Sequence, residues 1–399
     1  MNDFKGSVAE QDVTISTEIV KTAVVGENYY TAILYVTDRF EDFGNDTPVY
    51  PVVTKNTYAD VIDDYAYLSA EEKKIIKANL KSLYAYGDVT AYIIPASEVA
   101  NRNLYAYFTY LDLKWTVADG TTNDYALDAT AEQTLLGIKD FDKAFTRPVT
   151  EMPVDPSKVK GTSLTSTQGT FALLVAKELD LTVFARAAIP SGTVSANNAY
   201  LDSLGDLVGD SPALYQLGRS LSDYNTSQTP VGSDFDMRSV EFMDVLPTAE
   251  TDVNVLAGAS GVFANWFESV YINYFKPVGN GTMRVNNFGG WTIRANCVGA
   301  EWIVAYLNFV NRVACATIIT SGLALKNQKT YKALLNAVVA NISRFTLIGR
   351  IVDLVVSAPS FENLPISNGH TIIIPDAWRG TYVDNVRKVK ISGTLTVAA

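Results

Sequence analysis

Residues 31–36 (TAILYV), 69–84 (SAEEKKIIKANLKSLY) and 89–94 (VTAYII) decide the fold of this chain. The first and third are short apolar runs rich in β-branched and aromatic residues, which is typical of buried strands. The second begins with Ser69 and Glu72, the S-x-x-E pattern of a capping box, and then places its apolar residues on one helical face. We therefore predict a strand, a helix and a second strand in succession.

The C-terminal third of the chain predicts a pair of helices followed by strands. Residues 298–322 have the pattern of a long apolar helix, and a second helix is predicted to begin at 327 or 328 and to end at Gly349. Strands are predicted at 350–357 and 370–374. Because strands and helices alternate too irregularly along the whole chain for a doubly wound sheet, the predicted fold class is α+β.

The middle of the chain is predicted from shorter patterns. Apolar and turn residues indicate a strand at 106–116, a mixed segment at 171–189, and helices near 130–139 and 212–223. The sequence PVGNG at 277–281 is typical of a tight turn between short strands. We therefore expect this region to be ordered and to carry its own secondary structure.

The overall composition indicates a folded, acidic protein. Its 399 residues suffice for two or three domains, and a hydrophobic share of 48% with 19% charged residues excludes a wholly disordered chain. The formal net charge is -11 and the pI is near 4.7. Broad nucleic-acid binding requires clustered Lys and Arg, so we expect no nucleic-acid partner.

Cysteine usage and hydropathy predict where the chain is made. Cys297 and Cys315 are too few for a disulfide framework and lack the neighbouring ligands of a zinc site, so two free buried thiols are expected. The first ten residues contain no apolar run of signal-peptide length, which predicts synthesis in the cytoplasm. Residues 302–325 are long enough to span a membrane, but Asn308 and Arg312 near their middle favour a buried helix without membrane insertion.

Side chains for common enzyme chemistry are scarce. The only histidine, His370, begins an apolar strand pattern and is more typical of a packed or surface residue than of a catalytic base. The acid pairs Asp140/Asp142 and Asp234/Asp236 could serve a glycosidase or bind calcium, but the remaining ligand spacing of a calcium loop is missing. The sequence has no phosphate-binding glycine loop. We predict no catalytic, cofactor-binding or metal-binding residues.

Aromatic residues are frequent, with 22 Tyr and 17 Phe. A carbohydrate-binding platform is one interpretation of the Tyr-rich stretches. Packing in the core and at subunit interfaces is the favoured one, because Tyr is enriched at both. The tyrosines in question are Tyr65, Tyr67, Tyr84, Tyr86, Tyr105, Tyr107 and Tyr110.

Both ends of the chain alternate apolar and polar residues with the period of a strand. A terminal strand has unpaired backbone groups along its edge, so each arm is expected to pair with the other end of the same molecule or with a neighbouring copy. The alternating residues are Val13, Ile15, Thr17 and Ile19 in the first arm, and Val389, Ile391, Leu395 and Val397 in the last.

Charge favours pairing between the two arms. The first arm carries Asp12 and Glu18, and the last carries Arg387, Lys388 and Lys390. Opposite charges on adjacent strands stabilise pairing by roughly 0.2 to 1 kcal/mol per cross-strand pair. If the exchange takes place between copies, one surface meets a different surface, and such contacts generate rings or open helical arrays.

In the order of these features the chain resembles the contractile-tail sheath family, found in phages with contractile tails and in related injection machines. The features that carry the resemblance are the arm at 12–25, the two early strands, the turn VGNGT at 278–282 with GGWTI at 289–293, the paired helices at 298–345 and the ending WRGTYVDNVRKVKI at 378–391.

The resemblance implies a domain organisation. It implies a mixed α/β core domain built from both chain ends, middle domains that face outward, and terminal arms that exchange strands between subunits. The implied segments are an N-terminal arm at 1–25, a first α/β segment at 26–100, a middle region at 101–270, a C-terminal core domain at 271–383 and a C-terminal strand arm at 384–399.

The resemblance also implies a mechanical role in a virion. Hexameric rings of subunits would stack around a rigid inner tail tube and contract to drive the tube through the host cell envelope. The implied partners are other copies of the chain, the tube protein, and baseplate and tail terminator proteins. No cofactor is implied.

Two alternatives stay open at this point. A carbohydrate-binding or receptor-binding virion protein would use the Tyr-rich middle region, and binding of the soluble monomer to glycans would support it. A cytosolic enzyme would use an unfamiliar acid pair. Tubes seen by electron microscopy would support the sheath instead.

Overall fold

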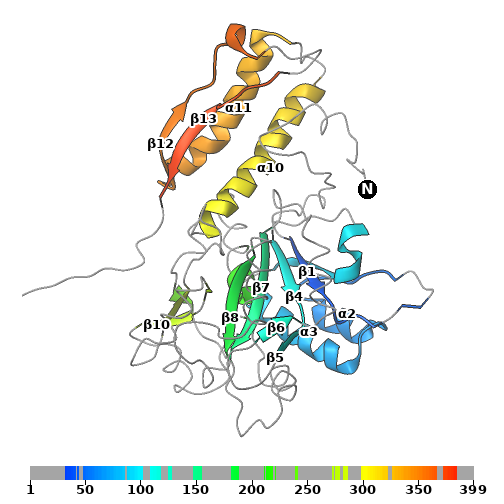
Figure 1. Ribbon diagram of the computed structural model, residues 1–399. Coiled ribbons are helices and arrows are strands. Elements are labelled where there is room, and N and C mark those ends of the chain that lie inside the picture. Colours follow the sequence, from blue (N-terminus) through cyan, green and yellow to red (C-terminus); the bar gives the residue numbers. More distant parts are fainter. Residues whose placement is uncertain are drawn as a thin grey trace, which may run out of the picture.

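The computed structural model describes the chain in a series of separate blocks. These are residues 32–41, 43–44, 48–85, 88–101, 108–117, 125–127, 147–154, 181–187, 211, 213–218, 221, 239–240, 272–273, 275–278, 282–285, 298–321, 326–365 and 372–383. Figure 1 shows a body built on a β-sheet, from which a pair of helices and a two-stranded ribbon project.

A six-stranded sheet forms the body, in the order β2-β3-β1-β4-β7-β8. Strand β1 pairs in parallel with β3 on one side and with β4 on the other, and β7 and β8 continue the parallel pairing outward. The short β2 pairs antiparallel with β3 at the other edge. The strands are β1 (Ala32–Thr37), β2 (Val52–Val53), β3 (Thr90–Pro95), β4 (Phe108–Asp112), β7 (Arg147–Val154) and β8 (Thr182–Ala187).

Helices α2 (Tyr58–Asp64) and α3 (Ala70–Leu83) form the crossover that makes β1 and β3 parallel. The capping box of α3 is present, because the side chain of Ser69 accepts a hydrogen bond from the Glu72 backbone and the Glu72 side chain accepts one from the Ser69 backbone. Two backbone N–H groups at the helix start that have no partner within the helix thereby receive an acceptor. The helix covers one face of the sheet with Ile76, Leu80 and Leu83.

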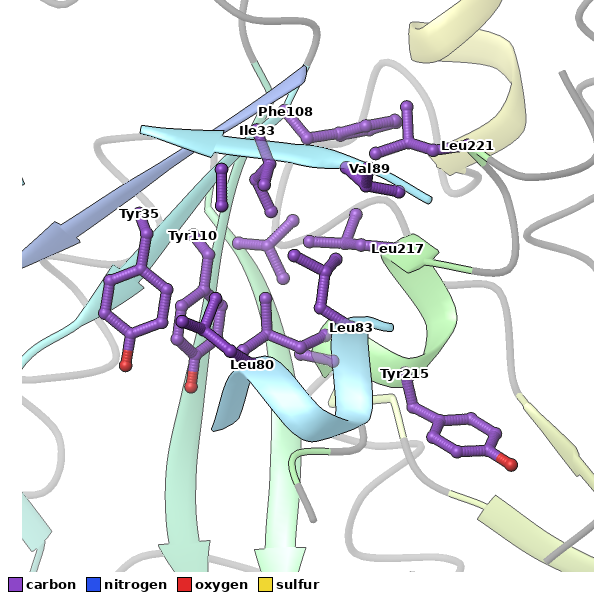
Figure 2. Close-up of a cluster of buried hydrophobic side chains, with 14 of the residues drawn as sticks. Ile33, Tyr35, Leu80, Leu83, Val89, Phe108, Tyr110, Tyr215, Leu217 and Leu221 are labelled. Carbon is purple, nitrogen blue, oxygen red and sulfur yellow. The ribbon is translucent and has the colours of Figure 1, made fainter. Parts of the chain in front are cut away.

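The hydrophobic core lies between the sheet, α3 and a helical turn at residues 213–218. Figure 2 shows side chains from these elements converging, including the ring of Tyr110 from β4. Burying each large apolar side chain contributes about 1.5–3 kcal/mol. Residues of this cluster labelled in the figure include Ile33, Leu80, Leu83, Val89, Phe108, Leu217 and Leu221.

A buried carboxylate fixes the helical turn at 213–218 to the sheet. Glu151 of β7 accepts hydrogen bonds from the Ala213 backbone N–H at 2.8 Å and from the Ser211 hydroxyl, and it accepts a longer one from the Tyr110 hydroxyl at 3.3 Å. A negative charge at a helix start is favourable. Gly218 closes the turn against α3, where a Cβ would lie 2.0 Å from the carbonyl oxygen of Leu83.

Two smaller groups of described strands accompany the main sheet. β5 (Trp115–Val117) pairs with β6 (Tyr125–Leu127), and β11 (Thr282–Val285) pairs with β10 (Phe275–Val278) and β9 (Ser239–Val240). Asn273 joins this second group to the main sheet, because its backbone N–H donates to the carbonyl of Val183 at 2.9 Å. A 3-10 helix, η2, covers Ala96–Asn101.

Helices α10 (Val298–Thr320) and α11 (Gln328–Leu347) form the projecting hairpin. Asn327 caps α11 by accepting a hydrogen bond from the Thr330 backbone at 3.0 Å. Within the contact between the helices, the amide of Asn341 donates to the Asn311 side chain at 3.0 Å. Such a polar pair in a helix contact favours one register over others.

The ribbon consists of β12 (Ile351–Val356) and β13 (Trp378–Tyr382), with a 3-10 helix, η5 (Phe361–Asn363), between them. The two strands are antiparallel. In Figure 1 the ribbon lies along α11.

The sequence predicted several elements correctly. The mixed α/β character, the strands at 31–36 and 89–94, and the helix between them are confirmed. The helices from 298 and from 327 or 328 and the strand at 350–357 are also confirmed, and part of the helix near 212–223 is present. Cys315 is a free buried thiol as expected.

The sequence patterns predicted no pairing direction for the strands, and the main sheet is largely parallel. Two predictions differ from the structure. Residues 372–374 are not in a strand, and the partner of β12 begins at Trp378 instead. The strand predicted at 106–116 is divided, because β4 ends at Asp112 and β5 pairs elsewhere.

Several predictions lie outside the described residues. They concern the helix near 130–139, Cys297, His370 and both acid pairs. Strands from the predicted first segment (β1, β3) and from the predicted middle region (β4, β7, β8) share one sheet. The five segment boundaries given above stay predictions.

Candidate assembly surface

The ribbon of β12 and β13 contains an irregularity at its centre. Val352 pairs with Thr381 and Val355 pairs with Arg379, so two residues of β12 stand opposite Gly380 alone. This is a β-bulge, which bends a strand and increases its twist. Gly380 fits the bulge closely, because a Cβ there would lie 2.6 Å from Cγ2 of Ile351.

The backbone of the ribbon is held in an uncommon conformation. Asp353, inside the bulge, has a φ of 52°, and Asp376, just before β13, has a φ of 45°. They are the two non-glycine residues with positive φ in the described part of the chain. Aspartate tolerates this region better than most residues, and such conformations concentrate at functional positions.

One face of the ribbon packs against α11. Ile351 is buried with Ile342 and Phe345 of that helix, and Trp378 and Tyr382 pack against the same cluster. Two strands alone are marginally stable in water, so this packing is what holds the ribbon in place.

Several apolar side chains of the ribbon are exposed to solvent. Val355, which pairs with Arg379 on the face away from α11, is 56% exposed, and Val356, which pairs with Trp378 on the opposite face, is 46% exposed. Exposed apolar side chains that gather in one part of a surface are typical of sites where another polypeptide binds, so we take the ribbon as a candidate interface. The exposed apolar residues of the ribbon and of the adjoining end of α11 are Leu347, Ile348, Val352, Val355, Val356, Ile373 and Val383.

Hydrogen bonds fasten the ends of the ribbon to the helix. The Arg350 backbone N–H donates to the Phe345 carbonyl at 2.9 Å, and the Val383 N–H donates to the Arg350 carbonyl at 2.9 Å. Gly349, with a φ of 72°, makes the turn out of α11. At the other end the hydroxyl of Tyr331 donates to the Pro359 carbonyl. The exposed valines are therefore presented on a fixed support.

None of the site residues predicted from the sequence lies within the described part of the chain. This applies to Asp12, Val13, Ile15, Thr17, Glu18 and Ile19 of the first arm, and to Arg387, Lys388, Val389, Lys390, Ile391, Leu395 and Val397 of the last. Sequence reasoning did not single out the exposed face of the ribbon. Gly380, in the stretch WRGTYVDNVRKVKI at 378–391, is the residue from which an irregular strand could have been predicted.

A polar cluster, separate from the ribbon, lies where β1 and β4 end. Oδ2 of Asp112 accepts hydrogen bonds from the Tyr35 hydroxyl at 2.7 Å and from the Thr37 hydroxyl at 3.3 Å. It also pairs with Nε of Arg39 at 3.0 Å. The Asn79 amide donates to the Tyr35 hydroxyl at 2.7 Å, which extends the network to α3. Tyr35, Thr37 and Arg39 all donate to the Asp112 carboxylate, and Asn79 is linked to it through Tyr35, so we interpret the cluster as a structural lock between β1, β4 and α3.

Burial and the neighbouring charges shift the pKa values of two groups in this lock. Burial acts against the charged form of Arg39, but the nearby Asp112 carboxylate overrides it and raises the pKa of the guanidinium. Burial, together with Asp112, raises the pKa of Tyr35 well above its usual value. Both groups therefore keep their protons throughout the ordinary pH range.

Asp38 lies between Thr37 and Arg39, beside this lock. Few groups stabilise the charge of its carboxylate. Its Oδ2 accepts a hydrogen bond from the Lys114 backbone at 3.0 Å, whereas Oδ1 makes none within the described part of the chain. Burial raises the pKa of Asp38 from 3.8 to about 6. The ionised carboxylate therefore destabilises the fold at neutral pH.

We expect Asp38→Asn to stabilise the protein at neutral pH. Because the folded-state pKa lies above the unfolded value, the folded state binds the proton more tightly, and stability falls as pH rises from about 4 to about 6. Removing the charge should add about 2–3 kcal/mol to the free energy of unfolding at pH 7 and almost nothing at pH 4. Urea unfolding at the two pH values measures this, and an equal gain at both would contradict it.

Some of the tyrosines considered for a carbohydrate platform belong to a packed cluster. Phe40 lies edge to face with Tyr65 at a centroid distance of 5.7 Å, and Phe43 lies edge to face with Tyr67 at 5.2 Å. Tyr84 and Tyr110 are buried. Edge-to-face contacts are the usual geometry of aromatic packing, so for these residues the packing interpretation is favoured.

Two findings on the described residues bear on other site types. No described helix has the length and hydropathy needed to cross a membrane. In the same residues, no three His, Cys, Asp or Glu side chains gather as a metal ion would require.

The chain has the fold of sheath proteins of contractile injection systems. The sequence itself matches no family model and no curated protein. The sheath complex of an extracellular contractile injection system, PVC, in its contracted state matches with a TM-score of 0.53 and 10% identity, over 96% of this chain and 98% of that one.

Two structures of the anti-feeding prophage agree with this. The helical sheath in its contracted state matches with a TM-score of 0.52 and 12% identity, over 96% of this chain and 98% of that one. A chain of the baseplate, 6-fold symmetrised, matches with a TM-score of 0.55 and 10% identity, again over 96% and 98%. At such low identity the likeness is one of fold.

Proposed function

We propose that this chain is the structural subunit of a contractile sheath. The single observation that carries the proposal is a fold shared with sheath chains along almost the whole length of both partners. The exposed apolar ribbon supports it, because a polymerising subunit must offer a surface to its neighbours. The role is mechanical and requires no catalytic residue.

We propose that the ribbon receives the terminal arms of neighbouring copies. Within the described residues β12 and β13 form a sheet of two strands, so each has an outer edge on which a further strand can add. The arms at 13–19 and 389–397 have the alternation that such a strand requires. Opposite charges on the arms would favour their lying next to each other on the ribbon.

The proposed assembly is a set of stacked hexameric rings around an inner tube. The sheath would contract from a metastable extended state, and the stored free energy would come from differences in interface packing and charge pairing between two lattices. Its other partners would be the tube protein and the baseplate and terminator proteins. The proposed location is the tail of a phage virion, after synthesis in the host cytoplasm.

Negative-stain microscopy of the purified full-length chain tests this function. Wild-type protein is expected to form tubes or stacked rings. Ile391→Asp is expected to leave the monomer folded, as judged by circular dichroism, and to abolish the tubes, because a charge would replace an apolar side chain of the paired arm. A wild-type chain that stays monomeric at high concentration, even beside its tube, would refute the sheath function.

A further inference from the structure

The sign of charge changes sharply in the C-terminal part of the chain. Residues 302–352 contain Lys or Arg at six positions and no Asp or Glu, although the whole chain has a net charge of -11. The negative excess therefore resides in the rest of the molecule. The six positions are Arg312, Lys326, Lys329, Lys332, Arg344 and Arg350.

Two of these lysines stand where the helix does not favour them. Lys329 and Lys332 are exposed near the start of α11 and are three residues apart, so they are neighbours on one side of the helix. The start of a helix carries partial positive charge, and it repels cations. Neither lysine forms an ion pair within the described part of the chain.

Helix α2 shows the opposite arrangement. Asp60 and Asp64 are exposed and four residues apart, so they too are neighbours, and Asp64 stands at the helix end, which disfavours anions. Their neighbour Asp63 is compensated, because its carboxylate pairs with Nζ of Lys77 and its carbonyl accepts from Nζ of Lys73 at 2.8 Å. Asp60 and Asp64 have no ion pair among the described residues.

We infer that the Lys329/Lys332 pair of one copy docks on the Asp60/Asp64 pair of another. Each pair is unfavourable by itself, and each presents two like charges at neighbouring positions of a helix, so the two pairs are complementary in sign and spacing. In Figure 1, α2 lies beside the sheet and α11 lies in the projecting hairpin. One copy therefore offers the two pairs to two different neighbours.

Such a contact is head-to-tail and leads to an open or ring-shaped array. This inference rests on the proposed sheath function, to which it adds one named electrostatic interface between subunits. Both pairs are exposed, so the contact is screened by salt and can be exchanged without unfolding either helix.

Charge reversal of the full-length chain tests the inference. Lys329→Glu with Lys332→Glu, and separately Asp60→Lys with Asp64→Lys, are each expected to raise the critical concentration for sedimentable assemblies about five- to thirtyfold at low salt. The variant with all four substitutions is expected to return to within about threefold of wild type. The differences should vanish at high salt.

Two controls separate this contact from general charge effects. Lys55→Glu with Lys81→Glu makes the same change in net charge at exposed positions elsewhere and is expected to assemble like wild type. Asp60→Asn with Asp64→Asn removes the charge without reversing it, and it should give a smaller rise. Thermal unfolding followed by circular dichroism shows whether each variant is folded.

The outcomes distinguish the inference from the proposed function. If wild type assembles and both reversed pairs assemble equally well, the contact is refuted while the sheath function stands. If the four substitutions together raise the critical concentration by as much as the effects of the two double variants combined, the two pairs contact other partners. The contact is then again refuted. A wild-type chain that forms no assembly refutes the sheath function itself.

Discussion

Asp112→Asn is expected to lower the free energy of unfolding by about 3 kcal/mol or more. Oδ2 of Asp112 receives three donors, from Tyr35, Thr37 and Arg39. The side chain that this substitution introduces is a neutral amide. Its own N–H groups can face the three donors instead of accepting from them. Removing one partner of a buried ion pair typically costs about 3–5 kcal/mol, and the low end applies here because the Arg39 side chain is 18% exposed.

The matched control is Asp63→Asn. Asp63 also pairs with a cation, Lys77, but its side chain is 54% exposed. An exposed ion pair contributes less than about 1 kcal/mol, so this variant should unfold close to wild type. Urea unfolding of the monomer at pH 7 measures both. Equal effects of Asp112→Asn and Asp63→Asn would contradict the interpretation of the Asp112 network as a structural lock.

Val355→Asp is expected to abolish assembly while leaving the subunit folded. Val355 is 56% exposed on the outer face of the ribbon, so the change should alter the free energy of unfolding by less than about 1 kcal/mol. In an assembled interface the same carboxylate would be buried without a partner, which costs several kcal/mol per subunit. We expect a rise of at least about a hundredfold in the concentration at which assemblies sediment.

Val49→Asp is the control for this effect. Val49 is 87% exposed and lies in the body of the molecule, outside the ribbon. It introduces the same charge at an exposed valine, so it should assemble like wild type. If Val355→Asp assembled as well as Val49→Asp, the outer face of the ribbon would not be an interface, although the chain could still be a sheath subunit.

The elements predicted correctly are those whose boundaries are set by local chemistry. Ser69 and Glu72 form their capping box within one turn, and Asn327 and Gly349 mark the two ends of α11 by side-chain and backbone conformation. Such features depend on residues a few positions apart. Short-range patterns in the sequence therefore sufficed to place these helices.

The strand order could not be predicted in the same way. β1 pairs with β4, whose residues lie about 75 positions away along the chain, as the contact between Thr37 and Asp112 illustrates. Likewise the apolar residues 372–374 have the pattern of a strand, yet β12 pairs with Trp378 and the residues after it. These choices are made by tertiary packing, which overrides local preference.

The candidate interface was hidden for a related reason. The sequence of β12, IVDLVV, is apolar nearly throughout, and such a run is typical of a buried strand. Only the fold shows that Val352, Val355 and Val356 face solvent. The two arms have a pattern that the sequence displays plainly, and their pairing stays a prediction.

The length of α10 has a mechanical consequence. Its 23 residues make a rod about 34 Å long at 1.5 Å per residue, with its first turn toward the sheet and its last at the tip of the projection. If the subunit turns during the proposed contraction, a tilt of about 20° at the base of α10 would carry its tip about 12 Å. A small rotation of the body would then move whatever is bound to the outer end much farther.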